Sequence, residues 1–170
     1  MSANDYYDIR SIQPKDNLTI AQIIREVMPE FGASGAGFAI HDPEIDDMYT
    51  AYRAPRCTYY IVADGIKLLG GGGISPLQGG DVKICELQKM YLLPEARGLG
   101  LGQRLLSLCI EDSKKFGYRD CYVETLKTME AAQTLYLTNG FKPLIKPLGQ
   151  TGHFGCDAWF IRALQNEKCI

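Results

Sequence analysis

The chain of 170 residues is long enough for one domain with a sizeable hydrophobic core, and we expect a single domain over residues 1–170. Hydrophobic residues make up 46% of the chain and charged residues 22%, which is the ordinary range of globular proteins. The formal net charge of −2 argues against nucleic acid or an anionic membrane surface as the main partner, because both attract basic proteins.

The first half of the sequence predicts a strand, two helices and a β-hairpin. Apolar residues recur at helical spacing after Asp16 and Asn17, either of which can cap a helix N-terminus. A second helix would begin with Asp42, Pro43 and Glu44, which supply a cap, a first-turn proline and an acid near the positive helix end. The predicted elements are a strand over 7–12, a helix within 15–31, a loop over 32–37, a helix over about 43–53, and strands over 57–64 and 66–77 joined by a turn at Asp64-Gly65.

The second half predicts alternating strands and helices. Leu101, Leu105 and Leu108 recur at i, i+4 and i+7, which gives one apolar helix face. Asn139-Gly140 predicts the end of another helix, because both residues accept the left-handed conformation. The predicted elements are strands over 83–93 and 119–126, helices over about 101–116 and 129–141, and a closing strand over 156–164. The element order predicts a mixed α/β domain.

No segment predicts export or membrane insertion. The N-terminus lacks the cationic start and apolar run of a secretory signal, and no stretch approaches the ~20 apolar residues of a membrane span. No cysteines pair as C-x-x-C, and His41 and His153 lack metal-ligand spacing, so we expect no metal. We expect reduced thiols and a cytoplasmic protein. The cysteines are Cys57, Cys85, Cys109, Cys121, Cys156 and Cys169.

Residues 94–104, PEARGLGLGQR, place a glycine-rich turn between a predicted strand and a predicted helix. Such a turn suits an anion, because the first helical N–H groups lack internal partners and glycines let the main chain approach. A Walker P-loop does not fit, since Gln103 stands where its second glycine is required. The Rossmann fingerprint also fails at its last position. The plain alternative is a tight connection whose glycines serve packing.

The segment Arg97-Gly98-Leu99-Gly100-Leu101-Gly102 fits the pattern [Q/R]-x-x-G-x-[G/A]. It resembles the pyrophosphate loop of the GNAT superfamily of acyl-coenzyme A-dependent N-acetyltransferases. The longer segment ELQKMYLLPEARGLGLGQRLL is similar to the main motif of that superfamily, and AAQTLYLTNGF resembles its second signature. The resemblance covers most of the chain. It implies a central, mostly antiparallel twisted sheet of about six to seven strands flanked by about four helices.

The resemblance also implies where acetyl-coenzyme A would bind. The loop N–H groups would hold the pyrophosphate, while the preceding strand would pair with the pantetheine arm and polarise the thioester oxygen. Many members carry Asn at the position of Met129, whose thioether cannot supply the same hydrogen bonds, and this leaves that contact open. The implied coenzyme residues are Met90, Tyr91, Leu92, Arg97, Gly98, Leu99, Gly100, Leu101, Gly102 and Gln103.

Three side chains are the main catalytic candidates. Tyr136 matches the family tyrosine that faces the coenzyme sulfur and could protonate the leaving thiolate. The alternative is that Tyr136 belongs to an amphipathic helix and fills the protein core. Glu86 and Glu124 match positions where GNAT enzymes carry a glutamate base, and their apolar strands would raise a carboxyl pKa. We favour Glu86 as the base. Either glutamate could instead pair with Lys or Arg at a strand end, and His41, His153 or a water chain are further candidates.

The resemblance implies an acyltransferase that moves an acetyl group, not an aminoacyl group, directly to a primary amine in a ternary complex. The acceptor would be a small molecule, an amino acid-like compound or a peptide N-terminus. By position, the acceptor pocket would be lined by Tyr49, Tyr52, His153 and Trp159. A cationic amine would be favoured by the acids at 42, 44, 46 and 47, unless these are helix-start acids exposed to water. The alternative function is a non-catalytic acyl-coenzyme A-binding or regulatory domain, and a homodimer stays open.

Overall fold

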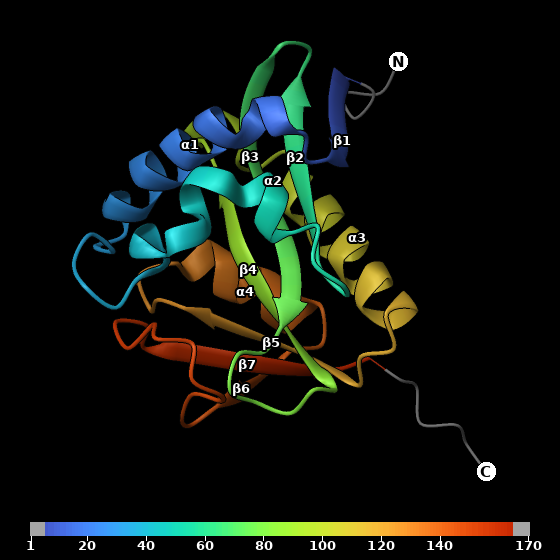
Figure 1. The fold of residues 1–170 in the computed structure, drawn as a ribbon. Coiled ribbons are helices and arrows are strands. Elements are labelled where there is room, and N and C mark those ends of the chain that lie inside the picture. Colours follow the sequence, from blue (N-terminus) through green and yellow to red (C-terminus); the bar gives the residue numbers. More distant parts are fainter. Residues whose placement is uncertain (1–5, 165–170) are drawn as a thin grey trace.

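The computed structural model describes residues 6–164, which form one seven-stranded sheet with helices on both faces (Figure 1). The strands lie in the order β1-β2-β3-β4-β5-β7-β6, and every neighbouring pair is antiparallel except β4 and β5. The strands are β1 (Tyr7–Ser11), β2 (Thr58–Asp64), β3 (Lys67–Pro76), β4 (Ile84–Leu92), β5 (Asp120–Thr125), β6 (Lys142–Leu144) and β7 (Ala158–Ala163). The α-helices are α1 (Asn17–Glu30), α2 (Met48–Ala51), α3 (Leu101–Lys115) and α4 (Glu130–Thr138). The predicted fold class is confirmed.

Alternation along β2 assigns the helices to opposite faces of the sheet. Tyr59 packs against Tyr52, just after α2, with ring centroids 5.0 Å apart. The next residue, Tyr60, points the other way and donates a 2.6 Å hydrogen bond to Asp112 of α3. Figure 1 accordingly shows α1 and α2 in front of the sheet and α3 and α4 behind it.

The strands β4 and β5 separate halfway along β4. They pair only from Ile84 to Leu87, although β4 continues to Leu92. The second half of β4 therefore has a main-chain edge without a partner strand on the β5 side. On the β3 side the register shifts at the same point, and Lys89 adopts a left-handed φ of 49°. This bulge turns the strand and changes where its side chains point.

The segment predicted as one helix over about 43–53 is helical over most of that range, but it is not a continuous helix. The segment forms a 3-10 helix, Pro43–Asp47, and then the single α-turn α2. Asp47 interrupts the two with φ −141° and caps α2 by accepting from the Thr50 N–H. Asp42 does not cap, because its carboxylate contacts Lys89 and His153 instead.

The predicted cap of the first helix is also wrong. The Asp16 carboxylate accepts hydrogen bonds from the Arg10 side chain and the Gln13 N–H, so it is not available to α1. Asn17 accepts from the N–H of Tyr49. The turn signal at Asp64-Gly65 is confirmed, since it joins β2 to β3.

The five cysteines within residues 6–164 are free, as expected for reduced thiols, and Cys169 lies outside the described residues. No helix among the described residues is long and apolar enough to cross a bilayer.

Candidate functional site

A cavity of about 290 Å³ lies where β4 ends, α3 begins and α4 passes beside them. It contains most of the residues that the sequence analysis assigns to the coenzyme. Leu99 and Leu101 do not line it, because Leu99 is 43% exposed and Leu101 is fully buried in the core. The predicted residues that line this wide cavity are Met90, Tyr91, Leu92, Arg97, Gly98, Gly100, Gly102, Gln103 and Tyr136, and Met129 also lines it.

The glycine loop leaves open space at the start of α3. Gly98 and Gly100 have φ values of 73° and 75°, which side chains rarely adopt, and a Cβ on either would meet nothing within 4 Å. Gly100 occupies the N-cap position of α3, and no side chain caps the helix there. The first N–H groups of α3 thus face a region that an anionic group can approach closely.

Arg97 completes this end of the wide cavity. Its Nε donates to the Leu92 carbonyl at 2.9 Å and its Nη1 to Glu30 at 2.9 Å. Its Nη2 is buried and has no hydrogen-bond partner within residues 6–164. A guanidinium with an unpartnered N–H, in the wall of the same cavity as the uncapped N–H groups of α3, fits a phosphate group. The residues present therefore suit the pyrophosphate of coenzyme A.

Tyr136 lies at the α4 side of the wide cavity and is 4% exposed. Its ring packs against Phe141 and Phe160, with centroids 5.6 and 6.0 Å away. Burial raises the pKa of its phenol well above the ordinary value, so the hydroxyl stays protonated at neutral pH. Both predicted roles are compatible with this position, since the ring belongs to the core and the residue lines the cavity.

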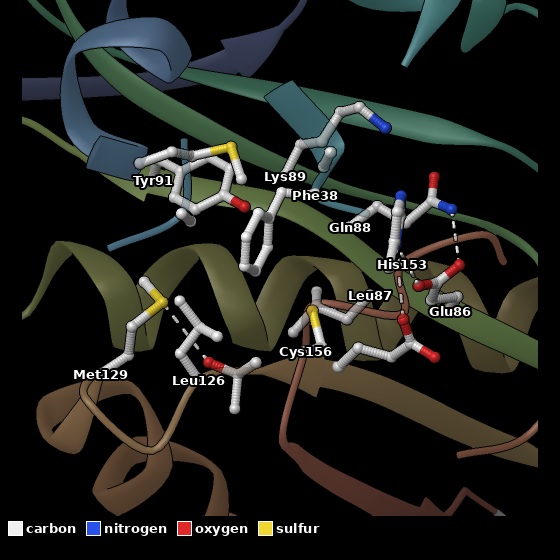
Figure 2. A pocket seen from close by; sticks show the side chains of 15 residues that line it. Phe38, Glu86, Leu87, Gln88, Lys89, Tyr91, Leu126, Met129, His153 and Cys156 are labelled. Atoms are coloured by element: carbon white, nitrogen blue, oxygen red, sulfur yellow. Dashed lines mark hydrogen bonds and ion pairs between the residues drawn. The ribbon is translucent and has the colours of Figure 1, made fainter. Parts of the chain in front are cut away.

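A second, narrow cavity of about 50 Å³ lies next to the wide cavity, and Tyr91 and Met129 line both. It is bounded by the β4–β5 opening, the 3-10 segment after α1 and the loop before β7. Figure 2 shows Tyr91, Leu126 and Met129 at one end of it, and Glu86 and His153 at the other. The narrow cavity is therefore apolar beside the wide cavity and ionisable at its far end.

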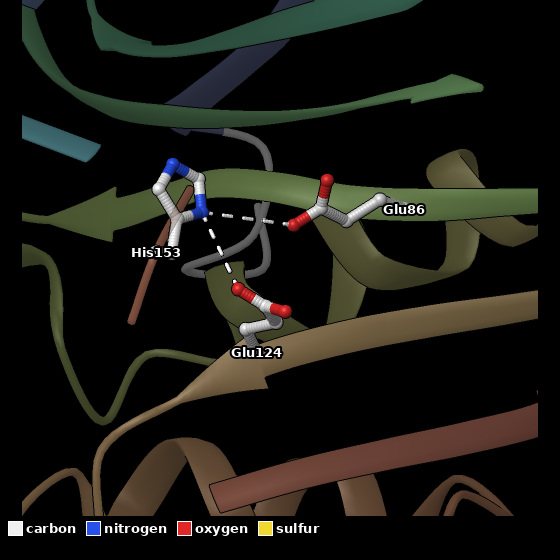
Figure 3. A group of neighbouring side chains, drawn as sticks. All are labelled: Glu86, Glu124 and His153. Carbon is white, nitrogen blue, oxygen red and sulfur yellow. Dashed lines mark ion pairs between the residues drawn. The ribbon is translucent and has the colours of Figure 1, made fainter. Parts of the chain in front are cut away.

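Glu86, Glu124 and His153 converge at that far end (Figure 3). The His153 Nδ1 lies 3.4 Å from Glu124 Oε2 and 3.9 Å from Glu86 Oε1. Glu124 is held by hydroxyl donors, Tyr122 at 2.7 Å and Thr151 at 2.9 Å. Glu86 accepts one hydrogen bond, from Gln88 to Oε2 at 2.7 Å, and its Oε1 accepts none within residues 6–164.

A buried lysine organises the wall behind this cluster. The Lys89 side chain is 0% exposed, and its Nζ lies 2.7 Å from Asp42 and 2.8 Å from Glu44. The His153 Nε2 lies 3.0 Å from the same Asp42. The carboxylates of Asp42 and Glu44 thus pair with internal cations, and the expectation that they are water-exposed helix-start acids is wrong. It holds only for the exposed Asp46 and Asp47.

Burial and neighbouring charges shift two pKa values in the cluster. Burial raises the pKa of Glu86 to about 7, with Glu124 adding to the rise and Gln88, His153 and Lys89 opposing it. Burial disfavours the charge on His153, but the hydrogen bonds to Asp42 and Glu124 and the charges of Asp42 and Glu86 outweigh it and raise its pKa to about 10. His153 is consequently an imidazolium at neutral pH.

The same three side chains place their ligand atoms within 4.8 Å of one another, a spacing that a metal ion can bridge. A metal would need the Nδ1 lone pair, which the imidazolium does not offer, and it would have to displace a proton with a pKa of about 10. The imidazolium itself supplies the positive charge between the carboxylates. A metal ion and the imidazolium proton would therefore compete for this position.

Of the remaining candidates from the sequence, one is connected to the cluster and three line neither cavity. Tyr52 is buried and connects to it, because its hydroxyl donates to Gln88 Oε1 at 2.7 Å. Tyr49, Trp159 and His41 line neither cavity. Trp159 pairs with Glu124 across β7 and β5 but packs in a separate cluster with Tyr122.

The sequence analysis missed Lys89, Gln88 and Cys156, which line the narrow cavity. One signal was available for Lys89. It interrupts an apolar strand, and a lysine buried in a sheet needs carboxylate partners. Its partners Asp42 and Glu44 lie 45 or more residues earlier, so the sequence alone did not indicate them.

Replacing His153 by Gln should destabilise the protein in a pH-dependent way. The folded pKa of about 10 exceeds the ordinary value of 6.5, so the stabilisation is complete below about pH 6.5 and disappears as the pH rises to 10. We expect a loss of about 2 kcal/mol at pH 6 and almost none at pH 10, measured by urea unfolding. His41→Gln is the control, because His41 forms no ion pair within residues 6–164. A loss independent of pH would contradict the charged state of His153.

Comparison with known proteins gives a consistent result. The sequence profile described as "Acetyltransferase (GNAT) family" matches residues 20–141. The chain is 39% identical over 157 residues to the uncharacterized N-acetyltransferase YjgM of Escherichia coli K12, covering 92% of this chain and 94% of that protein.

Solved structures agree with the sequence comparison. An acetyltransferase of the GNAT family from Staphylococcus aureus Mu50 superposes with a TM-score of 0.82 and 19% identity, covering 94% of this chain and 99% of the other. The protein yncA of Salmonella typhimurium, solved with its cofactor acetyl-CoA, has a TM-score of 0.75 and 17% identity, with 96% of each chain covered.

Proposed function

The chain belongs to the GNAT acetyltransferase family and is an acyltransferase, and from this premise we propose that it moves the acetyl group of acetyl-coenzyme A to a primary amine. We propose direct transfer, with donor and acceptor bound together. The observation that carries this proposal is that the two cavities lie side by side and share Tyr91 and Met129 in their walls. One cavity suits a long anionic donor, and the other presents a carboxylate with a free oxygen.

The residues of the wide cavity would hold the donor, whose thioester supplies the acetyl group. The loop N–H groups and the Arg97 guanidinium would bind its phosphates. The unpaired edge of β4 after Leu87 would bind the pantetheine arm through main-chain hydrogen bonds, and one N–H there would polarise the thioester carbonyl. The Leu92 carbonyl at the end of β4 already accepts a hydrogen bond from Arg97.

Glu86 is the base in this proposal. A pKa of about 7 leaves it partly ionised at neutral pH, and its free Oε1 can take a proton from the acceptor ammonium, directly or through water. Glu124 fits the role less well, because Tyr122, Thr151 and His153 surround its carboxylate. Tyr136 is the proposed proton donor to the leaving thiolate.

The direct experiment is an acetylation assay. Purified protein with acetyl-coenzyme A and a panel of primary amines should release free thiol faster than protein without an amine, with the acetylated amine identified by mass spectrometry. Tight coenzyme binding with no amine-dependent release across the panel would favour the alternative, a non-catalytic binding domain.

Gly102→Val should weaken coenzyme binding without unfolding the protein. Gly102 lines the wide cavity within the first turn of α3, and its added Cβ would make only ordinary contacts, the nearest 3.5 Å from Leu135. The branched side chain would occupy donor space, so we expect at least a roughly tenfold rise in the Kd of acetyl-coenzyme A by calorimetry. Gly100→Val is a poorer choice, since its φ of 75° strains any β-branched residue.

Lys114→Val introduces the same side chain at an exposed position of α3 that lines neither cavity, so it is the control and should bind normally. Unchanged affinity in a folded Gly102→Val variant would mean that the donor lies elsewhere.

A cytoplasmic location and a homodimer remain part of the proposal, and the free thiols of the described cysteines support the first.

A further inference from the structure

The narrow cavity and the wall behind it hold more carboxylates than cations. Two of the carboxylates line the cavity and two stand behind it, against one lysine and one imidazolium. With Glu86 ionised the cluster carries a net charge of −2, from four carboxylates and two cations. The six side chains are Asp42, Glu44, Glu86, Glu124, Lys89 and His153.

Both cations of the cluster already contact carboxylates. Lys89 Nζ contacts Asp42 and Glu44 and is fully buried. His153 directs Nε2 to Asp42 and Nδ1 toward Glu124. No other lysine, arginine or histidine is among the described residues that line the narrow cavity. An acceptor carboxylate would therefore find no free cation there.

A free hydrogen-bonding position in the narrow cavity belongs to an anion, the carboxylate of Glu86. Glu86 Oε1 lies 3.9 Å from its nearest cationic neighbour, His153 Nδ1, which is too far for a hydrogen bond. Glu86 is only 3% exposed as a residue, and this oxygen accepts no hydrogen bond from the described residues. It suits the N–H of an amine.

We infer that the acceptor is a primary amine with no anionic group beside the amine, such as an amino-acid amide or a peptide N-terminus, and not a free α-amino acid. This inference rests on the proposed function. A carboxylate on the neighbouring carbon would lie near Glu86 and Glu124 in a largely buried space, where like charges repel strongly. A neutral substituent can instead contact the apolar end at Phe38 and Leu126 (Figure 2).

Leucinamide and leucine are suitable probes, because they share their shape and differ in one charge. We expect kcat/KM for leucinamide to exceed that for leucine by roughly 100-fold. Binding of each probe to the coenzyme A complex, followed by ligand-observed NMR, should show the same preference without depending on turnover.

The variant Glu44→Gln tests whether charge causes the preference. It removes one anionic partner of Lys89 at the cavity wall, so the leucinamide-to-leucine ratio should fall by roughly tenfold. Comparing ratios between proteins cancels the different basicity of the two amines. Glu111→Gln, an exposed residue of α3, makes the same charge change and should leave the ratio unaltered.

Three results would overturn the inference: equal or better use of leucine, a ratio that Glu44→Gln leaves unchanged, or no binding of leucinamide. The proposed function would survive each of these if another amine in the panel were acetylated. If no amine in the panel were acetylated while leucinamide still bound in preference to leucine, the proposed function would fail and the charge selectivity of the cavity would stand.

Discussion

Replacing Glu86 by Gln is expected to lower kcat/KM for the acetylated amine by roughly 100- to 10,000-fold, the range for loss of a general base. The change keeps the shape of the side chain and removes its basicity. Wild-type activity should fall as the pH drops through about 7, because protonation of Glu86 removes the base. The variant should lose this acidic limb of its pH–rate profile.

Glu124→Gln is the matched control, since it makes the same chemical change 3.4 Å from the same histidine nitrogen. It should keep the acidic limb even if the loss of its hydrogen bonds slows the enzyme. If Glu124→Gln lost the limb and Glu86→Gln kept it, the assignments would have to be exchanged. If both variants kept wild-type rates, water and not a glutamate would deprotonate the acceptor amine.

Stability distinguishes an inactive Glu86→Gln protein from an unfolded one. The Glu86 pKa of about 7 lies above the ordinary 4.5, so the wild type loses stability as the pH rises from about 4.5 through 7. Gln cannot ionise and avoids that loss. The variant should therefore melt a few degrees above the wild type at pH 8 and close to it at pH 4.5.

Replacing Lys89 by Met is expected to destabilise the protein by roughly 3 kcal/mol, because it leaves Asp42 and Glu44 without their buried cation. Met has a similar length, so the packing changes little. The value lies at the lower end for a buried pair, since Glu44 is 30% exposed and can recruit water. Denaturant unfolding at pH 7 measures it.

Lys67→Met provides the comparison, since Lys67 pairs with Glu95 where the side chains are 60% and 50% exposed. Exposed pairs contribute only about 0–1 kcal/mol, so this variant should resemble the wild type. Equal losses in the two variants would show that burial of Lys89 has no energetic consequence. A Lys89→Met protein as stable as the wild type would contradict the role of Lys89 in the wall.

The sequence by itself determined most of the order of the elements and the position of the glycine loop, because both depend on local patterns. Helical spacing after Leu101 and the turn at Asp64-Gly65 are properties of neighbouring residues, and the structure bears them out. The loop pattern between Arg97 and Gly102 is equally local, and its family resemblance agrees with the matched GNAT profile.

Only the tertiary structure decided how the charges combine. The Asp42 carboxylate could cap a helix as well as any acid before a proline, but the fold brings it to Lys89 and to His153, 111 residues away. Because the Lys89 ammonium is buried, leaving it without a carboxylate would cost more than leaving an exposed helix end uncapped. The pKa of Glu86 likewise depends on the depth of β4 and on neighbours from other segments, which no local pattern encodes.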